Sequence, residues 1–241
     1  MSPAPKHCPE QQLCNILSAA ACCIEETSLL DFTMSAIAKK AGMSMGSIYK
    51  HVHTKEDVLI ALSQHGFIRL RETFTAIFKT PLTVAEQLIA LSLLDYSKVD
   101  PYPFTRHLEM LVSNSALLKR SSPQWQQQMS TACDGIDILM LTHFRQAISD
   151  GELTTTGDED ACLQQLQLGI WAINVGHIQV LLQTHSENQA SNLPKAIFPL
   201  ATDNPHVLNC MRLINSFDWR QPLTEEGIKR AAQTLIELGF R

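Results

Sequence analysis

The sequence predicts an all-α fold, and three observations support this prediction. Apolar residues recur at helical spacing along most of the 241 residues, whereas no useful length shows the apolar–polar alternation of a half-buried strand. Capping residues and prolines separate the periodic segments. With 45% hydrophobic and 18% charged residues, the composition is typical of a soluble globular protein.

The first predicted helix covers residues 11–27, where apolar residues fall on one face of an amphipathic helix. These residues are Leu13, Ile16, Leu17, Ala20 and Ile24. Residues 1–10 contain three prolines and no apolar run, so we expect a flexible tail rather than a secretory signal.

Two short helices follow, and side chains that favour helix ends mark their limits. Thr33 is a good N-cap for a helix over residues 34–41, and Gly42 lies where a helix favours a left-handed residue at its C-terminal end. Ser44 is the next N-cap and opens a helix over residues 45–52. We therefore predict two short helices joined by a tight turn that contains glycine.

A long helix is predicted next, over residues 55–78, with Thr54 and Asp57 in a pattern like a capping box. Pro81 marks its boundary. The remaining helices are predicted over residues 84–98, 104–118, 123–149, 158–184, 205–217 and 224–238. Asp150-Gly151 is expected to form a turn, and residues 186–203 a loop.

These elements predict a tail over residues 1–10, a three-helix helix-turn-helix domain with a connecting helix over residues 11–80, and a helical domain over residues 81–241. The net charge is −5, yet residues 1–80 hold eight basic and seven acidic side chains. Residues 32–55 contain four lysines, two histidines and no acid. A basic segment on an acidic body fits a DNA-binding head, although a solvated lysine face would have the same composition.

Other classes of protein are disfavoured. No apolar run reaches the roughly 18 residues that a membrane helix needs. The seven cysteines are scattered without a CxxC pair or zinc spacing, so we interpret them as buried thiols of a cytoplasmic protein. No nucleophile–base signature, phosphate loop or metal set is present, and we therefore expect neither an enzyme nor a cofactor.

The segment over residues 33–55 carries the functional prediction. Its two short helices form a helix-turn-helix arrangement, in which the second helix can enter a DNA major groove. Burial of Ile37, Ala38, Ala41, Ile48 and Val52 would hold these helices against their neighbours. The residues left for the outer face are Met45, Gly46, Ser47, Tyr49, Lys50 and His51.

The chemistry of this outer face suits nucleic acid. Small residues let the backbone approach a base edge, and hydroxyl groups such as that of Tyr49 reach phosphates. Lys50 can contact a guanine edge or a phosphate, and Lys55 lies where a helix N-terminus already favours phosphate. The alternatives are that Tyr49 and Met45 pack inward, and that His51 is a satisfied surface histidine.

This segment resembles the DNA-binding domain of the TetR family of regulators. The residues that carry the resemblance are Ile37-Ala38, Ala41-Gly42, Ser44, Gly46-Ser47-Ile48-Tyr49, His51-Val52, Lys55-Glu56 and Val58-Leu59. Matches are dense over about 25 residues and extend weakly over residues 13–62.

The resemblance implies a role for each matched position. Thr33, Ser44, Ser47, Tyr49, His51 and Lys55 match positions that contact phosphates or bases, whereas Met45, Gly46 and Lys50 match positions that vary with the operator. Two features depart from the family pattern. The turn over residues 28–32 keeps an aromatic residue, Phe32, but lacks the usual glycine. Met34 and Ser35 stand where many family members have a basic or polar residue that contacts the bases.

For the C-terminal domain the resemblance is architectural. Residues 143–153 look like the end of the family's long central helix, and the helices over residues 158–184 and near Met211 would form a dimer's four-helix bundle. A dimer is also needed because two recognition helices must reach half-sites roughly 34–36 Å apart. We therefore expect a homodimer on a pseudo-palindromic operator in double-stranded DNA.

A small-molecule effector is expected to bind between the helices of this domain. The candidate lining residues are Phe104, His107, Met110, Leu111, Trp125, Met129, Phe144, Trp171, Asn174 and His177. A mostly apolar cavity with a few polar groups suits such a ligand, although the same residues could form ordinary core. The sequence thus predicts a repressor released by a largely apolar ligand; the alternative is a DNA-binding protein of the same fold that has a protein partner or no small-molecule effector.

Overall fold

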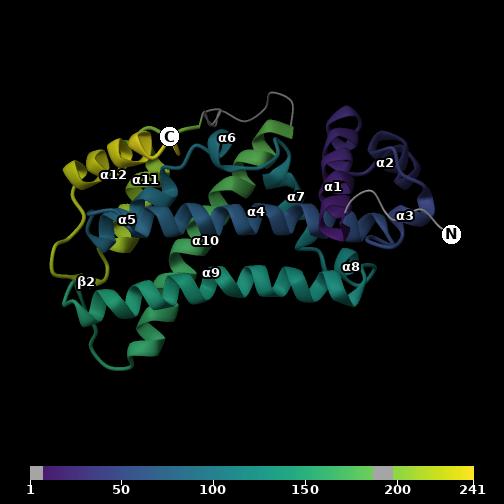
Figure 1. The fold of residues 1–241 in the computed structure, drawn as a ribbon. Helices are drawn as coiled ribbons and strands as arrows, with labels where there is room; N and C mark the ends of the chain where they lie inside the picture. Colours follow the sequence, from purple (N-terminus) through teal and green to yellow (C-terminus); the bar gives the residue numbers. More distant parts are fainter. Residues whose placement is uncertain (1–7, 187–197) are drawn as a thin grey trace. The chain divides into compact units, whose positions relative to one another are not determined.

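The computed structural model describes residues 8–186 and 198–241, and Figure 1 shows its ribbon. Helices dominate these residues, which confirms the all-α prediction. In chain order the elements are α1 (Pro9–Glu26), α2 (Met34–Ala41), α3 (Met45–Ile48), α4 (Lys55–Phe78), α5 (Val84–Ser92), α6 (Tyr96–Val99), α7 (Thr105–Val112), α8 (Ser115–Leu118), α9 (Pro123–Ser149), β1 (Leu153–Thr154), α10 (Glu159–Ser186), α11 (Pro205–Ile214), β2 (Asp218–Trp219) and α12 (Glu225–Glu237).

The chain packs into two compact units. The first, which we refer to as the head unit, combines Met1–Ile68 with Pro101–Cys133, and the second, the body unit, combines Arg69–Asp100 with Asp134–Arg241. The long helices α4 and α9 therefore each contribute residues to both units. This grouping by packing differs from the division after residue 80 that the sequence predicts, and the functional boundaries of the domains stay a prediction.

The head unit has its own apolar core. Its buried side chains come from α1, α2, α3, the beginning of α4, α7 and the first turn of α9. Ile16, Ala20 and Ile24 of α1 are at most 3% exposed, so the predicted amphipathic face of this helix is the buried one. In Figure 1, α1, α2 and α3 lie together beside the N-terminal end of α4.

The body unit has a second core, built around α5. All nine residues of α5 are buried, and α11 and α12 pack against this helix. Strands β1 and β2 form a short antiparallel pair in which Leu153 lies opposite Trp219. The pair follows the predicted turn at the end of α9, where Gly151 has a φ of 68° and the Glu152 N–H donates to the Ala147 carbonyl over 2.8 Å.

Two predicted helices are each divided in the structure. The helix expected over residues 84–98 ends at Ser92, because Asp95 accepts hydrogen bonds from the Ser97 amide (3.0 Å) and hydroxyl (2.6 Å) and so caps a separate turn. The helix expected over residues 104–118 is divided by Asn114, whose side chain accepts from the Ala116 amide. Short polar side chains thus compete with the continuing helix.

The remaining boundaries differ from the predictions by a few residues. Helix α1 begins at Pro9, inside the tail predicted over residues 1–10, and residues 1–7 of that tail lie outside the described residues. Helix α3 ends at Ile48 rather than at residue 52. Of the loop predicted over residues 186–203, residues 187–197 lie outside the described residues and 198–203 contain no helix. Among the described helices, none has the length and apolar character to cross a membrane.

Candidate nucleic-acid interface

Local capping interactions set the geometry of the two short helices. The Ala36 amide donates to Thr33 Oγ1 over 3.1 Å at the start of α2, and the Ser47 amide donates to Ser44 Oγ over 3.2 Å at the start of α3. Between them Gly42 adopts the left-handed conformation with φ 64° and ψ 31°. All three predicted roles are confirmed, because capping depends on residues close in sequence.

Burial orients the segment over residues 45–52. Ile37 on α2, and Ile48 and Val52 in the segment, have no exposed surface, so these side chains fix both helices to the head core. Tyr49 is 44% exposed, and Lys50 is also exposed. The half-buried Met45 packs against the head core, so only part of its side chain is accessible.

Gly46 lies in this exposed segment although packing does not require a glycine there. A Cβ atom at Gly46 would meet nothing closer than Ser44 Oγ at 3.9 Å, and the backbone φ is not positive. Glycine within a helix costs about 0.5–1 kcal/mol relative to alanine. The missing side chain therefore leaves room on the outside of the molecule, where another molecule can approach the backbone closely.

Several of the predicted DNA-contacting groups already have partners within the head unit. Thr33 Oγ1 lies 3.0 Å from Ser35 Oγ, and Ser44 Oγ lies 3.0 Å from Ser47 Oγ. His51 is half-buried, with Nε2 3.1 Å from Gln12 Oε1 on α1. These contacts orient the hydroxyl groups and the imidazole before any ligand binds.

Lys55 is held in place by two contacts with the turn between α1 and α2. Its Nζ donates to the Leu30 carbonyl over 2.8 Å and lies 4.6 Å from the centre of the Phe32 ring. An ammonium group has three donors, so two remain for a phosphate. The turn lacks the glycine usual in the TetR family, yet it positions this lysine through a backbone carbonyl.

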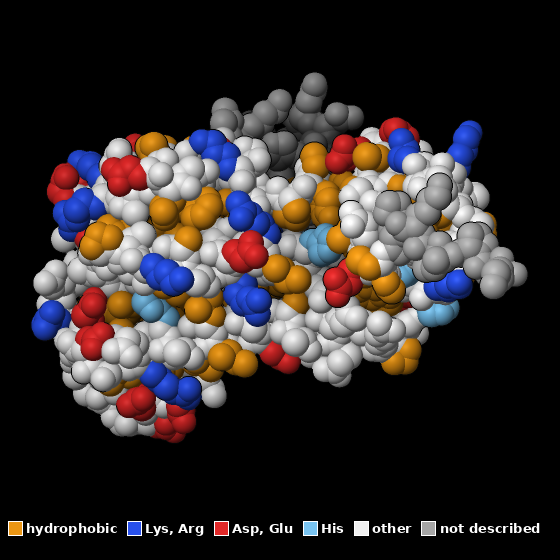
Figure 2. All heavy atoms as spheres, in the orientation of Figure 1, with side chains coloured by type: hydrophobic (Ala, Val, Ile, Leu, Met, Phe, Trp, Pro, Cys, Tyr) orange, Lys and Arg blue, Asp and Glu red, His pale blue; other side chains and the backbone are white. Residues whose placement is uncertain are grey.

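The positive charge of the segment is smaller than the lysine count predicts. Lys40 forms an ion pair with Glu26 over 2.6 Å, and this hydrogen bond raises the pKa of Lys40. Lys39, Lys50 and Lys55 therefore provide the cationic groups that no described carboxylate pairs with. On the face of the molecule in Figure 2, basic and acidic side chains are interspersed.

A buried carboxylate behind the segment connects it to a distant turn. Asp57 has no exposed surface, and it accepts hydrogen bonds from the amides of His53 (2.8 Å), Thr54 (3.3 Å) and Ser122 (2.6 Å) and from Ser122 Oγ (2.7 Å). Burial acts to raise the pKa of Asp57, but these hydrogen bonds outweigh burial and lower the pKa below its usual value. Sequence reasoning found the cap formed by Asp57 but not the contribution of Ser122.

The predicted effector-binding residues are divided between the two units. In the head unit, Phe104, His107 and Leu111 line a largely apolar groove of about 620 Å³ together with residues of α1 and of the turn that follows it. Three further candidates in this unit lie elsewhere: Met110 is 37% exposed, Trp125 is buried, and Met129 packs against the head core.

In the body unit, Phe144 is fully buried core, whereas Trp171 is 64% exposed on α10. The Asn174 side chain donates from Nδ2 to the Ile170 carbonyl over 2.8 Å, and the His177 ring stacks on His206 with ring centres 3.9 Å apart. Which of the candidates bind an effector stays a prediction.

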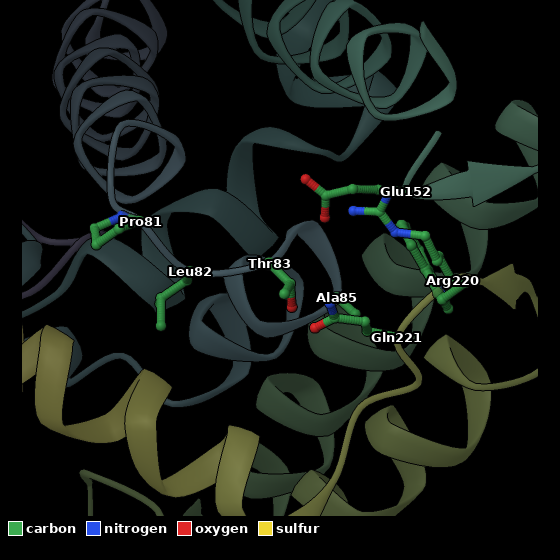
Figure 3. Close-up of a pocket in the computed structure, with 8 residues that line it drawn as sticks. Pro81, Leu82, Thr83, Ala85, Glu152, Arg220 and Gln221 are labelled. Atoms are coloured by element: carbon green, nitrogen blue, oxygen red, sulfur yellow. The ribbon is translucent and has the colours of Figure 1, made fainter. Parts of the chain in front are cut away.

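A smaller and more polar pocket lies in the body unit (Figure 3). It has a volume of about 140 Å³, and its lining residues are Pro81, Leu82, Thr83, Ala85, Glu152, Trp219, Arg220 and Gln221. One oxygen of Glu152 accepts a hydrogen bond from the Val84 amide over 3.0 Å, so this carboxylate also caps α5. The pocket is smaller than the 300–1,000 Å³ typical of sites for drug-sized ligands, and none of the predicted effector residues lines it.

Comparison with known proteins identifies the helix-turn-helix segment. Residues 16–62 match the sequence model described as bacterial regulatory proteins, tetR family. This match covers α1, α2 and α3 and the beginning of α4. No curated protein matches the sequence.

Solved structures with the same fold cover most of the chain. A transcriptional regulator of the TetR/AcrR family from Thermobifida fusca YX-ER1 has 18% identity and a TM-score of 0.55, with 87% of this chain and 99% of that chain covered. FadR from Bacillus subtilis, in complex with stearoyl-CoA, has 18% identity and a TM-score of 0.53, covering 84% and 95%. The SmeT–triclosan complex has 16% identity and a TM-score of 0.53, covering 89% and 95%. Residues 16–62 therefore match the tetR family of bacterial regulatory proteins, and the chain as a whole has the fold of these TetR/AcrR regulators.

Proposed function

We propose that this protein is a sequence-specific DNA-binding transcriptional regulator that acts as a homodimer, with a small, largely apolar ligand releasing it from its operator. Gly46 is the observation that carries the DNA-binding part of this proposal. A glycine that the protein interior does not require, between Ser44 and the exposed Tyr49 and Lys50, fits a backbone that approaches a base edge.

The contacts within the head unit define the expected roles. Tyr49 and Lys55 would bind phosphates, because Tyr49 presents an exposed hydroxyl and Lys55 retains two donors at the N-terminus of α4. Lys50 would read a base edge in the major groove. Thr33, Ser44, Ser47 and His51 would add contacts from hydroxyl or imidazole groups that the head unit already orients.

An exposed apolar face on α10 supports the homodimer. Leu168, Trp171 and Val175 are 59%, 64% and 45% exposed, and their spacing of three and four residues places them on one helical face. Gly176 lies beside them, and a Cβ there would meet no atom within 4 Å. Large exposed apolar patches mark interaction sites, and a second copy of the same helix would cover this one.

The apolar groove of the head unit supports an effector that acts on DNA binding. Leu29 and Leu30 line the groove, and the Leu30 carbonyl holds Lys55 Nζ. A ligand that moved this turn would therefore move a lysine that we assign to phosphate binding. FadR and SmeT, which have the same fold, were solved with stearoyl-CoA and triclosan, and a small-molecule ligand is consistent with that precedent.

Selection of binding sites from random DNA, followed by fluorescence anisotropy at two salt concentrations, tests the proposal. We expect a selected palindromic site and an affinity that falls steeply with salt. Tyr49→Ala and Lys55→Ala should weaken binding to all sequences, whereas Lys50→Ala should also change the preferred sequence. Failure to select any site, or unchanged affinity in both phosphate-contact variants, would contradict the proposed docking.

The same anisotropy assay tests the effector. Apolar compounds that bind the wild-type protein are added to the complex with DNA, and Phe104→Ala serves as the groove variant because Phe104 lines the groove. We expect compounds that release the wild-type protein to act more weakly on this variant. If no compound releases the protein although DNA binding is specific, control by a protein partner becomes the better hypothesis.

A further inference from the structure

Residues 45–53, which we call the reading segment, are contacted by the turn before α9, although this turn lies about 70 residues further along the sequence. Asp57 receives two of its hydrogen bonds from its own capping region and the other two from Ser122. The bonds from Ser122 are short, at 2.6 and 2.7 Å, and Asp57 has no exposed surface. Water therefore does not compete for this carboxylate, and the contact joins the turn firmly to the start of α4.

Two further contacts join the same parts of the head unit. Trp125 Nε1 donates to the His51 carbonyl over 3.3 Å, and Trp125 is only 3% exposed. Arg120 Nε lies 2.9 Å from Glu56 Oε1. Residues 120–125 thus contact both the end of the reading segment and the first turn of α4.

The reading segment depends on such external contacts. Helix α3 contains only four residues, Met45–Ile48, and so short a helix is not stable by itself. Ser44 fixes its beginning, but the helix is followed by a turn over residues 49–51 and by residues 52–53 without regular structure, and the carbonyl groups there need partners. The Trp125 indole supplies one such partner, and Asp57 holds the next amides along the chain.

We propose that Ser122 and Trp125 are positioning residues for DNA recognition: they orient residues 49–53 without contacting DNA. The turn that contains Ser122 leads directly into α9, which continues to Ser149 in the body unit. A displacement along α9 would therefore reach the reading segment through these two side chains. This inference rests on the proposed DNA-binding function.

The test compares Ser122→Ala and Trp125→Phe with the matched control Ser121→Ala. The Ser122 variant loses one bond to Asp57, and the Trp125 variant loses the indole donor but keeps an aromatic ring. Ser121 is buried and Ser122 is half-buried, but the Ser121 hydroxyl donates to the Leu118 carbonyl within its own turn. Each full-length variant is examined by amide hydrogen exchange, thermal unfolding and anisotropy with selected DNA.

We expect exchange of the amides in residues 49–53 to become roughly five- to tenfold faster in both variants, as loss of one hydrogen bond implies, while Ser121→Ala matches the wild type. The affinity for DNA should fall by a similar factor, and the salt dependence should weaken by about one phosphate contact. These effects should appear even where the unfolding temperature changes little.

Unchanged exchange and unchanged DNA affinity in both variants would overturn the inference. So would a lower unfolding temperature with wild-type affinity and salt dependence, because that result indicates a purely structural role. If the wild-type protein selects no DNA, the proposed function fails; the exchange rates of residues 49–53 still decide whether Ser122 and Trp125 hold the segment.

Discussion

The head and body units differ in how they accommodate buried ionisable groups. In the head unit, hydrogen bonds hold the pKa of Asp57 below its usual value despite burial. In the body unit, burial lowers the pKa of His143 and of His206 to about 4, so both imidazoles are neutral. The His143 ring stacks on Phe78 at 3.9 Å, and the His206 ring stacks on His177 at the same distance.

This difference determines the pH range in which each unit loses stability. The contribution of Asp57 is present above its usual pKa of 3.8 and is lost only as the pH falls through its lower value in the folded protein. The unfolded chain binds protons at His143 and His206 from about pH 6.5 downwards, whereas the folded protein does so near pH 4. His65 of the head unit also has a lowered pKa because of burial. The head unit thus depends on the charged Asp57 as well as on the neutral His65, whereas the body unit holds two neutral histidines whose pKa values fall to about 4.

Among these predictions, we expect Asp57→Ala to change the free energy of unfolding most. It leaves the Ser122 hydroxyl and the amides of His53 and Thr54 without their partner, which should lower the free energy of unfolding by about 3 kcal/mol. Urea denaturation measures this change. Asp31→Ala is the matched control, since the exposed Asp31 accepts a hydrogen bond from Ser28, and it should change the free energy by less than about 1 kcal/mol. Equal changes in the free energy of unfolding for the two variants would show that burial of Asp57 does not increase its contribution to stability.

Acidification should destabilise the body unit before the head unit. Between about pH 6.5 and 4, His206 should contribute a loss of roughly 3 kcal/mol, because the unfolded chain binds the proton more strongly. Hydrogen exchange measured separately for the two units at pH 7, 5.5 and 4.5 checks the order. His206→Gln should reduce the pH dependence of the body unit, and a head unit that opened first would contradict the comparison.

Trp171→Glu tests whether the exposed apolar face of the body unit, rather than that of the head unit, forms the dimer interface. Because Trp171 is 64% exposed in the single chain, the substitution should scarcely alter folding but should weaken the proposed dimer by at least about tenfold, as expected for an aromatic contact in an interface. Sedimentation velocity over a concentration series measures the dissociation constant. Leu30→Glu, at an even more exposed apolar position of the head unit, is the control and should leave the dimer intact. Dissociation caused by Leu30→Glu alone would place the interface on the head.

Gly46→Ala should produce the smallest change in folding and the most informative one for function. Alanine favours the helix and meets no close contact, so stability should increase by up to about 1 kcal/mol. DNA affinity should nevertheless decrease, because the methyl group occupies the space left for the operator. Thermal unfolding and anisotropy on the same samples separate the two effects. An increase in stability with unchanged affinity would remove Gly46 from the interface.

Sequence reasoning was accurate where structure depends on near neighbours. Thr33, Gly42 and Ser44 have their predicted roles because a cap is formed within three or four residues, and α2, α4 and α9 have the predicted bounds. Reasoning of this kind failed where a short polar residue divided a helix, as at Asp95 and Asn114, since the same residues also occur within longer helices.

Contacts between distant segments could not be predicted. Ser122 has no sequence signature that distinguishes it from the neighbouring Ser121, yet only Ser122 bonds to Asp57. Similarly, the sequence indicates that Lys55 begins a helix but not that its ammonium group contacts the Leu30 carbonyl. Such partners depend on tertiary packing, which brings together residues that no local pattern relates.

The division of α4 and α9 between the two units has a consequence for engineering chimeric regulators. An exchange of residues 1–80 between two proteins of this fold would separate Asp57 from Ser122 and His51 from Trp125. A transplant that preserves these pairs must include both Met1–Ile68 and Pro101–Cys133. The side chains that hold the helix-turn-helix segment are therefore encoded in two separate stretches of the gene, and recombination at a single crossover point would separate them.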